Sequence, residues 1–421
     1  MHVHQRFSSI SRRPAVAGGL AVIALGAAAL VRPSVAAATP TSGSGSSGAS
    51  GAVSYAGVKA AESAFQAAGP LADPVACQRP APDNQVSAYV HCYAPDQLRT
   101  LYGLKPLTAS TTDGAGQTIV LVDSYGSPTA AQDLAFFAKT LGGPAPDFEQ
   151  VFPGGTPNTA GATGKGKGTS GPTAAEGWAG EATLDIERAY AIAPKAHIVL
   201  IGTNPGRDAR RPGPARPHEG DRLGINTYPS GTVFSMSFGT DESWAGIATG
   251  GGLSTVYSRP AYQNVVANVV GSHRGVPDLS WNAAVNGGVL VHRSFFPALD
   301  GPPSWAVYGG TSAGSPQAAA MTAIANQARA ALGKKPIGDL NAAIYSTSVD
   351  KTAAFRGIVP IKDGTAPSGY LHNNQIWDTD ADGNVVPDAV PGYPTTAGYD
   401  LTTGWGSPLA PGYVSQLAAL T

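Results

Sequence analysis

The segment EATLDIERAYAIAPKAHIVLIGT, residues 181–203, joins a helix-like run to a strand-like run through a short turn. Residues 181–192 carry apolar side chains typical of a well-buried helix, and residues 197–203 form a short apolar run typical of a buried strand. The same alternation continues along the chain, with strand-like runs at 117–125, 232–239 and 287–292 and helix-like runs at 131–141 and from Pro316 onward. This order predicts an α/β fold, a mostly parallel sheet with helices on both faces.

The composition limits the class of protein. Of 421 residues, 42% are hydrophobic and 13% charged, so the chain can bury a large core. The formal net charge of −1 gives no long-range field that would attract nucleic acid or an anionic membrane. The 54 Gly and 35 Pro predict many turns and long surface loops. We therefore expect no nucleic acid among its partners.

Residues 1–38 have the layout of a secretory signal peptide. Arginines precede a mostly apolar stretch from Pro14 to Val31, and a small-residue exit follows. A membrane anchor is the alternative, because 18 residues is a borderline length for a span, but the Ala and Gly content favours removal. Residues 39–75 are a Gly/Ser/Ala-rich linker or short pro-segment, and residues 76–421 form the domain. The layout predicts an exported, extracellular protein without stable membrane association after signal removal.

The chain has two cysteines, Cys77 and Cys92, 15 positions apart. In an oxidising compartment they are expected to form a disulfide, which would stabilise the fold by roughly 3 kcal/mol in the loop-entropy model. Two unpaired thiols are the alternative. With two Cys and scattered His, a zinc site is not expected.

Ser312 lies in the stretch YGGTSAGSP, residues 308–316, just before a helix-like run. Gly309 and Gly310 allow backbone conformations closed to other residues, so Ser312 could sit on a tight turn with its Oγ pointing outward. Pro316 suits a first helical turn. A lone serine is usually a turn residue, so a chemical role requires a base, and none of the eight histidines lies in a Gly-rich turn suited to that role.

Carboxylates are the other candidates for the base. Glu181 and Asp185 are four apart, so on a helix they share a face. Two carboxyls held close in a low-dielectric site cannot both ionise, so one could act as a base and the other orient it. Such a base works in acid, at roughly pH 3–5. Two solvated helix carboxylates are the alternative.

The segments GEATLDIERAYAIAPKAHI and YGGTSAGSP together resemble the sedolisin family of serine-carboxyl peptidases. Further segments are similar to the family at 92–104, 250–263, 274–283 and 397–408. The resemblance implies an enlarged subtilisin-like sheet and a secreted, acid-acting endopeptidase of proteins or peptides, expected to be a monomer. It implies Ser312 as nucleophile, Glu181 as general base and Asp185 as the residue that orients Glu181.

The chain departs from the family where a protonated Asp stabilises the oxyanion. Residues 243–252 contain no Asp, and the spacing predicts that one or more elements are missing after residue 242. Asp241 or Glu242 could substitute, but an ordinary turn is the stronger interpretation. The alternative function is therefore a catalytically impaired, shortened relative acting as a binding or structural module. A neutral subtilisin-like protease would need a histidine base.

The resemblance also implies a calcium site near the C-terminus. Asp400 and the carbonyls of Thr396 and Gly398 match the family, and Ile358 can offer its carbonyl. Gly357 stands where an Asp is expected, so we expect a weakened site.

Two further segments and one further residue are interpreted as structural. Residues 378–384 are interpreted as a polar turn rather than a second calcium site. The Arg/Pro-rich stretch 204–222 is expected to be a solvated loop, with a basic patch or a reading-frame error as alternatives. Asp123, at the end of a strand-like run, lies where subtilisin-like enzymes keep a catalytic Asp, but a structural role is the stronger interpretation here.

Overall fold

A computed structural model describes residues 75–76, 91–109, 112–157, 174–203, 227–237, 251–283, 288–295, 304–359, 377–379, 385–387 and 392–421. Several predictions fall outside these residues: the signal peptide, nearly all of the linker, Cys77, the stretch 204–222, and Asp241 and Glu242 with the following gap.

A four-stranded sheet in the order β4-β5-β3-β6 is the base of the fold. Its strands are β3 (Thr118–Ser124), β4 (Asp147–Val151), β5 (His197–Thr203) and β6 (Val233–Met236). All three pairings are parallel, as the alternating runs predict. The carboxyl ends of β3, β5 and β6 therefore lie along one edge, where functional groups gather in such sheets.

Side chains of β3 and β5 enter different cores on the two faces of this sheet. Ile119, Leu121 and Leu200 join the main core, whereas Val120 and Val199 belong to a smaller cluster on the other face. Because both faces are apolar, these strands read as continuous hydrophobic runs.

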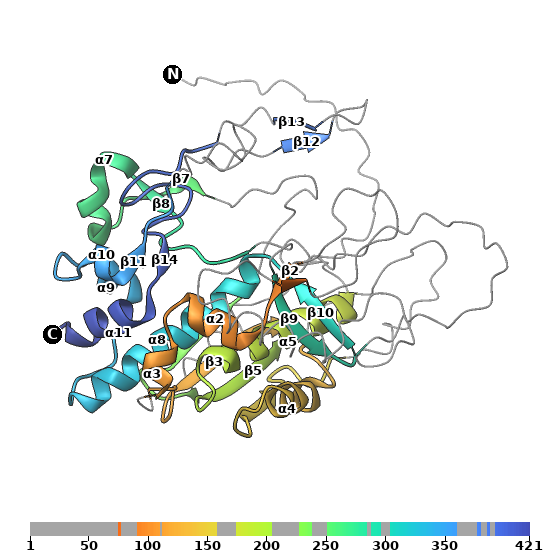
Figure 1. Ribbon diagram of the computed structural model, residues 1–421. Helices are drawn as coiled ribbons and strands as arrows, with labels where there is room; N and C mark the ends of the chain where they lie inside the picture. The colour runs from red at the N-terminus through yellow and green to blue at the C-terminus, as the bar shows by residue number, and fades with distance from the viewer. Residues whose placement is uncertain are drawn as a thin grey trace, which may run out of the picture.

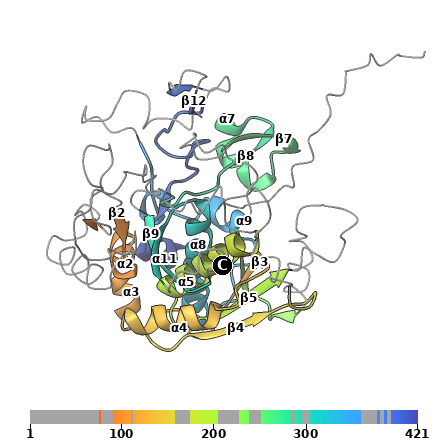
Figure 2. The same ribbon diagram turned by 90° about the vertical axis from the view of Figure 1, so that its right-hand side faces the viewer.

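Helix α5 (Ala174–Ile192) is central, and it packs against β3, β5, α4 (Ala130–Thr140) and α8 (Gly314–Ala331). Figures 1 and 2 show α5 and α8 lying above the parallel sheet. α5 begins seven residues before the predicted start at residue 181. Burial of Trp178 and Ala179 against the rest of the fold accounts for this extension.

A second four-stranded sheet has the order β1-β2-β9-β10. It consists of β1 (Val75–Ala76), β2 (His91–Tyr93), β9 (Gly288–Arg293) and β10 (Ser304–Tyr308). β9 pairs with β2 in parallel but with β10 in antiparallel orientation. The β9–β10 connection, residues 294–303, is shorter than the dozen or more residues that a parallel crossover needs. The parallel sheet predicted for the whole domain is thus accompanied by a mixed one.

The remaining elements surround these sheets. Near the start of the domain are α2 (Pro95–Leu101) and α3 (Lys105–Ala109). The middle of the chain contributes β7 (Gly252–Ser258), η3 (Ala261–Val266), α7 (Ala267–Val270), β8 (His273–Val276) and η4 (Thr311–Ala313). The C-terminal part holds α9 (Leu340–Tyr345), α10 (Lys351–Ala354), β11 (Phe355–Arg356), β12 (Trp377–Thr379), β13 (Val385–Pro387), β14 (Ser407–Pro408) and α11 (Ala410–Ala419). In both views the hairpins β7–β8 and β12–β13 lie on the side away from the parallel sheet (Figures 1 and 2).

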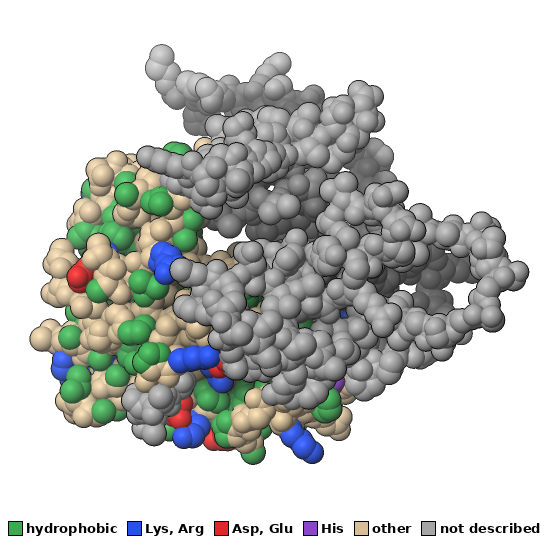
Figure 3. All heavy atoms as spheres, in the orientation of Figure 1, with side chains coloured by type: hydrophobic (Ala, Val, Ile, Leu, Met, Phe, Trp, Pro, Cys, Tyr) green, Lys and Arg blue, Asp and Glu red, His purple; other side chains and the backbone are tan. Residues whose placement is uncertain are grey.

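Charged side chains of both signs are interspersed along the lower part of the described surface (Figure 3). This distribution agrees with the formal net charge of −1. Within the described ranges, no helix combines the length and the apolar character needed to cross a bilayer.

Candidate active site

Ser312 lies in a turn between β10 and α8. Gly310 has φ +95°, the left-handed region that favours glycine, and its N–H donates to the Ala283 carbonyl at 2.7 Å. The short helix η4 then carries Ser312, and α8 begins at Gly314. The predicted tight turn is confirmed, but Ser312 is only 4% exposed rather than pointing into solvent.

Helix α5 carries Glu181 and Asp185 one turn apart and presents them to this turn, because α5 contacts η4 directly. Both side chains are buried, with exposed fractions of 2% and 0%. The alternative of two solvated helix carboxylates is therefore wrong. The Ser312 hydroxyl lies close enough to Glu181 to lower the pKa of that carboxyl.

The contact between Ser312 and Glu181 is looser than a regular hydrogen bond. Neither Glu181 carboxylate oxygen has a partner of normal hydrogen-bond geometry within the described part of the chain. A proton transfer between these groups needs a short, aligned contact. Catalytic hydrogen bonds often become short only when substrate binds.

A third carboxyl joins this pair. Asp123, the second-last residue of β3, is fully buried, and neither of its carboxylate oxygens has a hydrogen-bond partner in the described residues. Its charge raises the pKa of both Glu181 and Asp185. The sequence alone favours a structural role for Asp123. Its electrostatic contact with both residues instead makes it part of the candidate site.

Burial is the main cause of the raised pKa values of these three carboxyls. It raises the pKa of Asp123 to about 8. The pKa values of Glu181 and Asp185 lie well above their ordinary values, first through burial and then through the neighbouring carboxyls. Three such groups cannot all ionise together, so they share protons over a wide pH range.

Ser237, immediately after β6, limits this effect at Asp185. Its hydroxyl contacts both carboxylate oxygens of Asp185, at 3.1 and 2.9 Å, and lowers the pKa of that carboxyl. The sequence contains no signal for this residue, because only the pairing of β6 with β3 brings it to α5. A hydroxyl that donates to Asp185 fixes its orientation beside Glu181.

A second buried polar cluster anchors α5 from another side. Arg188 donates from Nη2 to the Leu290 carbonyl at 2.5 Å, and Glu187 accepts the His292 backbone N–H at 3.0 Å. The His292 ring lies 3.5 Å from Asp133, which also accepts from Ser294. These contacts tie α5 to β9 and α4, so the helix that carries Glu181 and Asp185 is held on both sides.

The described residues at the predicted calcium site do not fit that ion. Asp400 Oδ1 accepts from the N–H groups of Thr402 and Thr403 and from Thr403 Oγ1, at 2.9, 2.7 and 3.1 Å. Asp400 Oδ2 accepts from the Thr396 N–H and Thr403 Oγ1, at 2.9 and 3.2 Å. Calcium needs six to eight oxygen ligands, and in these ranges no group of three His, Cys, Asp or Glu side chains could hold a metal. The Asp400 carboxylate, which would join the carbonyls of Gly398 and Ile358 in a calcium shell, is thus occupied by the protein's own donors.

Only one of the two cysteines of the predicted disulfide lies within the described residues. Cys92 in β2 is 1% exposed and is not a free thiol. Its predicted partner Cys77 lies outside the described residues, so that pairing stays a prediction.

No protein-family model matches the chain. It is 29% identical over 194 residues to tripeptidyl-peptidase sed4 of Aspergillus fumigatus, covering 41% of this chain and 29% of the relative. It is 26% identical over 200 residues to tripeptidyl-peptidase 1 of Macaca fascicularis, covering 45% and 31%. The matched part thus amounts to about a third or less of the length of these curated relatives.

Among solved structures, Pseudomonas sedolisin, a serine-carboxyl proteinase complexed with two molecules of pseudo-iodotyrostatin, aligns with a TM-score of 0.50. The sequences are 16% identical, and the alignment covers 78% of this chain and 97% of that one. At this identity the likeness concerns the fold. The relatives and the shared fold confirm the predicted resemblance to the sedolisin family and the predicted α/β class.

Proposed function

We propose that the chain is a serine-carboxyl peptidase that hydrolyses peptide bonds through an acyl-enzyme on Ser312. One observation carries the proposal: the Ser312 turn meets a helix face bearing two buried carboxyls, with a third carboxyl beside them. Burying three neighbouring carboxyls, of which only Asp185 accepts a regular hydrogen bond among the described residues, is costly for a fold, so their position beside a sheltered hydroxyl favours a chemical role.

Each group has a defined part in the proposed reaction. Ser312 Oγ attacks the scissile carbonyl carbon while its proton passes to ionised Glu181. The tetrahedral intermediate collapses to an ester on Ser312, and Glu181 returns the proton to the leaving amine. Water then attacks the ester with Glu181 again as base, which releases the acid product and restores Ser312. Asp185, protonated and held by Ser237, orients Glu181. The charge of the buried Asp123 raises the pKa of both Glu181 and Asp185 and so favours their protonated forms.

The pH dependence follows from the signs of these shifts. Activity needs Glu181 ionised, and because its pKa is raised, the acid limb of the rate profile lies above the ordinary carboxyl range. It also needs a proton on Asp185, whose pKa is raised first by burial and then by the charges of Asp123 and Glu181, so activity falls on the alkaline side as that proton is lost. We therefore propose a weakly acidic optimum, above the range of roughly pH 3–5 expected from unperturbed carboxyls.

The substrates that we propose are proteins or peptides, and the protein acts after export as a secreted monomer. Cleavage inside a chain is the proposed mode. The relatives whose names say tripeptidyl-peptidase make release of N-terminal tripeptides the other mode to test.

A second candidate function is a catalytically impaired relative that acts as a binding or structural module. The observation that favours it is the absence of an Asp from residues 243–252, where the resemblance implies an oxyanion donor. Loss of one such donor costs roughly 10²–10³ in rate.

The test is hydrolysis of a denatured protein by the purified chain between about pH 3 and about pH 8, with Ser312→Ala and Glu181→Gln beside it. Mass spectrometry of the products separates internal cleavage from tripeptide release. Activity lost in both variants, with their unfolding transitions intact, supports the peptidase. A folded chain without activity at any pH excludes it and favours the binding module.

A further inference from the structure

The loop of residues 392–408, here called the Asp400 loop, is closed by a single buried carboxylate. Asp400 is 3% exposed and accepts from four donor groups, the N–H groups of Thr396, Thr402 and Thr403 and the Thr403 hydroxyl, which lies within reach of both oxygens. A carboxylate offers about four lone-pair sites. The protein's own donors therefore saturate both oxygens.

The same loop is closed a second time through its backbone. Asp400 and Gly404 exchange both N–H to carbonyl bonds, each at 3.1 Å. Gly404 has φ +62°, and a Cβ there would collide with the backbone of Asp278. The loop is thus pressed directly against the segment that follows β8.

Hydrogen bonds fasten this contact. Trp405 N–H donates to the Asp278 carbonyl at 3.0 Å, and Ser280 N–H donates to the Gly406 carbonyl at 3.1 Å. The Asp278 carboxylate accepts from the Tyr345 hydroxyl at 2.8 Å and pairs with Arg274.

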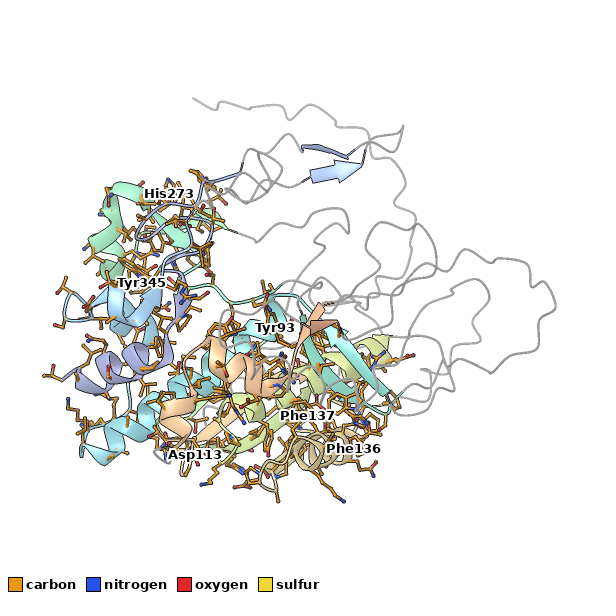
Figure 4. The ribbon with its side chains drawn as sticks, viewed as in Figure 1. Tyr93, Asp113, Phe136, Phe137, His273 and Tyr345 are labelled. Carbon is orange, nitrogen blue, oxygen red and sulfur yellow. The ribbon has the colours of Figure 1, made fainter. Side chains whose placement is uncertain are left out.

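Aromatic rings pack around Tyr345 at this contact. The Tyr345 ring lies 5.8 Å from that of Tyr399 and 5.7 Å from that of Trp405, measured between centroids. Figure 4 shows Tyr345 between the β7–β8 hairpin, marked by His273, and the C-terminal helices. The Asp400 loop, the hairpin and α9 are therefore packed into one unit.

The segment after Asp278 leads directly to the Ser312 turn. Trp281 packs on Gly314 at the start of α8 and stacks on Tyr102 with ring centroids 4.3 Å apart. The Ala283 carbonyl accepts the Gly310 N–H at 2.7 Å. A continuous chain of contacts thus runs from Asp400 to the residues on both sides of Ser312.

We propose that Asp400 is a positioning residue that closes this loop with protein donors alone, without calcium, and thereby holds the Ser312 turn in place. Thr403 is its main side-chain partner, because its hydroxyl contacts both oxygens of Asp400. The proposal concerns the fold around Ser312, so it stands or falls independently of peptidase activity.

The first experiment measures thermal unfolding of the full chain in calcium chloride and in EDTA, together with calorimetric titration of the same protein with calcium. We expect the same unfolding midpoint in both solutions and no heat of binding. A midpoint raised by calcium, or binding that Asp400→Asn abolishes, would overturn the proposal, since Asp400 would then be a metal ligand.

The second experiment compares Thr403→Val with Thr403→Ser. Valine removes the hydroxyl at similar size, and serine keeps it. We expect Thr403→Val to lower the unfolding midpoint by about 2–4 °C and Thr403→Ser to restore most of the loss.

Hydrogen exchange at residues 304–316 distinguishes positioning from general destabilisation. We expect faster exchange there in Thr403→Val but not in Thr403→Ser. The control is Gly143→Ala, which destabilises the fold through a clash with the Tyr190 hydroxyl rather than through the Asp400 loop. Equal exchange of this segment in Thr403→Val and wild type, or equal acceleration in the Gly143 control, would refute the proposed role.

Discussion

Replacing Asp123 with asparagine should flatten the dependence of stability on pH. Burial raises the pKa of this carboxyl from its ordinary 3.8 to about 8. The folded protein therefore keeps a proton that the unfolded chain releases as soon as the pH exceeds about 4. The unfolding free energy thus falls as the pH rises from there toward 8, and the contribution is fully present only below the unfolded pKa.

The expected change in unfolding free energy follows from the interval between the unfolded and the folded pKa of Asp123. Each pH unit between the unfolded and the folded pKa lowers the unfolding free energy by about 1.4 kcal/mol, so the whole interval corresponds to about 6 kcal/mol as an upper bound. Asparagine has a similar shape and never ionises. Near pH 4, where the aspartate is protonated, the two proteins should be about equally stable, and near pH 8 the variant should be more stable by several kcal/mol.

Urea unfolding followed by tryptophan fluorescence at a series of pH values measures this difference. Asp350→Asn is the matched control. Asp350 caps α10, its pKa is lowered by hydrogen bonds from Thr352 and Ala353, and asparagine is an equally good cap. Its contribution has the opposite sign, since it is lost as the pH falls. If the wild type and Asp123→Asn lose the same free energy between pH 4 and pH 8, the reasoning about the buried carboxyl is wrong.

Three further changes test other parts of the site and its support. Ser237→Ala should shift the alkaline limb of the pH–rate profile upward by about one to two pH units, because Asp185 loses a hydroxyl that stabilises its ionised form, whereas Ser237→Thr should leave the limb in place. Gly180→Ala should destabilise the fold by about 1–3 kcal/mol in urea unfolding, because its Cβ would lie 2.8 Å from Arg293 Nη1 and 2.9 Å from Tyr308 Oη. Adding Tyr308→Phe should recover part of that loss, and no recovery would point to another cause. Arg188→Met should cost about 3–5 kcal/mol by leaving Glu187 buried without its positive neighbour, and the double change with Glu187→Gln should restore much of it, which the same unfolding measurement checks.

The secondary structure was largely predictable because the runs are long and strongly apolar. The predicted strand at 197–203 is β5 to the residue, and the helix at 131–141 is α4 within one residue at each end. The start of α5 was missed because Gly177 and Gly180 lower helix propensity there, and only the buried packing of Trp178 overrides them.

The candidate site was predictable in part. The spacing of Glu181 and Asp185 predicts that they share a helix face, and the glycines before Ser312 indicate a turn. Ser237 comes to the site only through the pairing of β6 with β3, which no local pattern encodes. Asp123 was within reach of sequence reasoning, because it stands at a strand end where a catalytic role was the alternative to a structural one. The resemblance implied Asp400 as a metal ligand, but the hydrogen bonds that its carboxylate accepts from neighbouring N–H groups depend on the folded conformation of the loop.

The pairing of β2 with β9 joins Cys92 to Gly288, 196 positions later in the chain. The Ala410 N–H likewise donates to the Tyr102 carbonyl at 2.8 Å, so the last helix is bound to one of the first. Contacts of such long range close only after most of the loop entropy has been lost, and they make folding slow. Strand β2 must therefore remain without its β9 partner until residues 288–293 have been synthesised, and the exposed strand edge makes the chain more prone to aggregate in that interval.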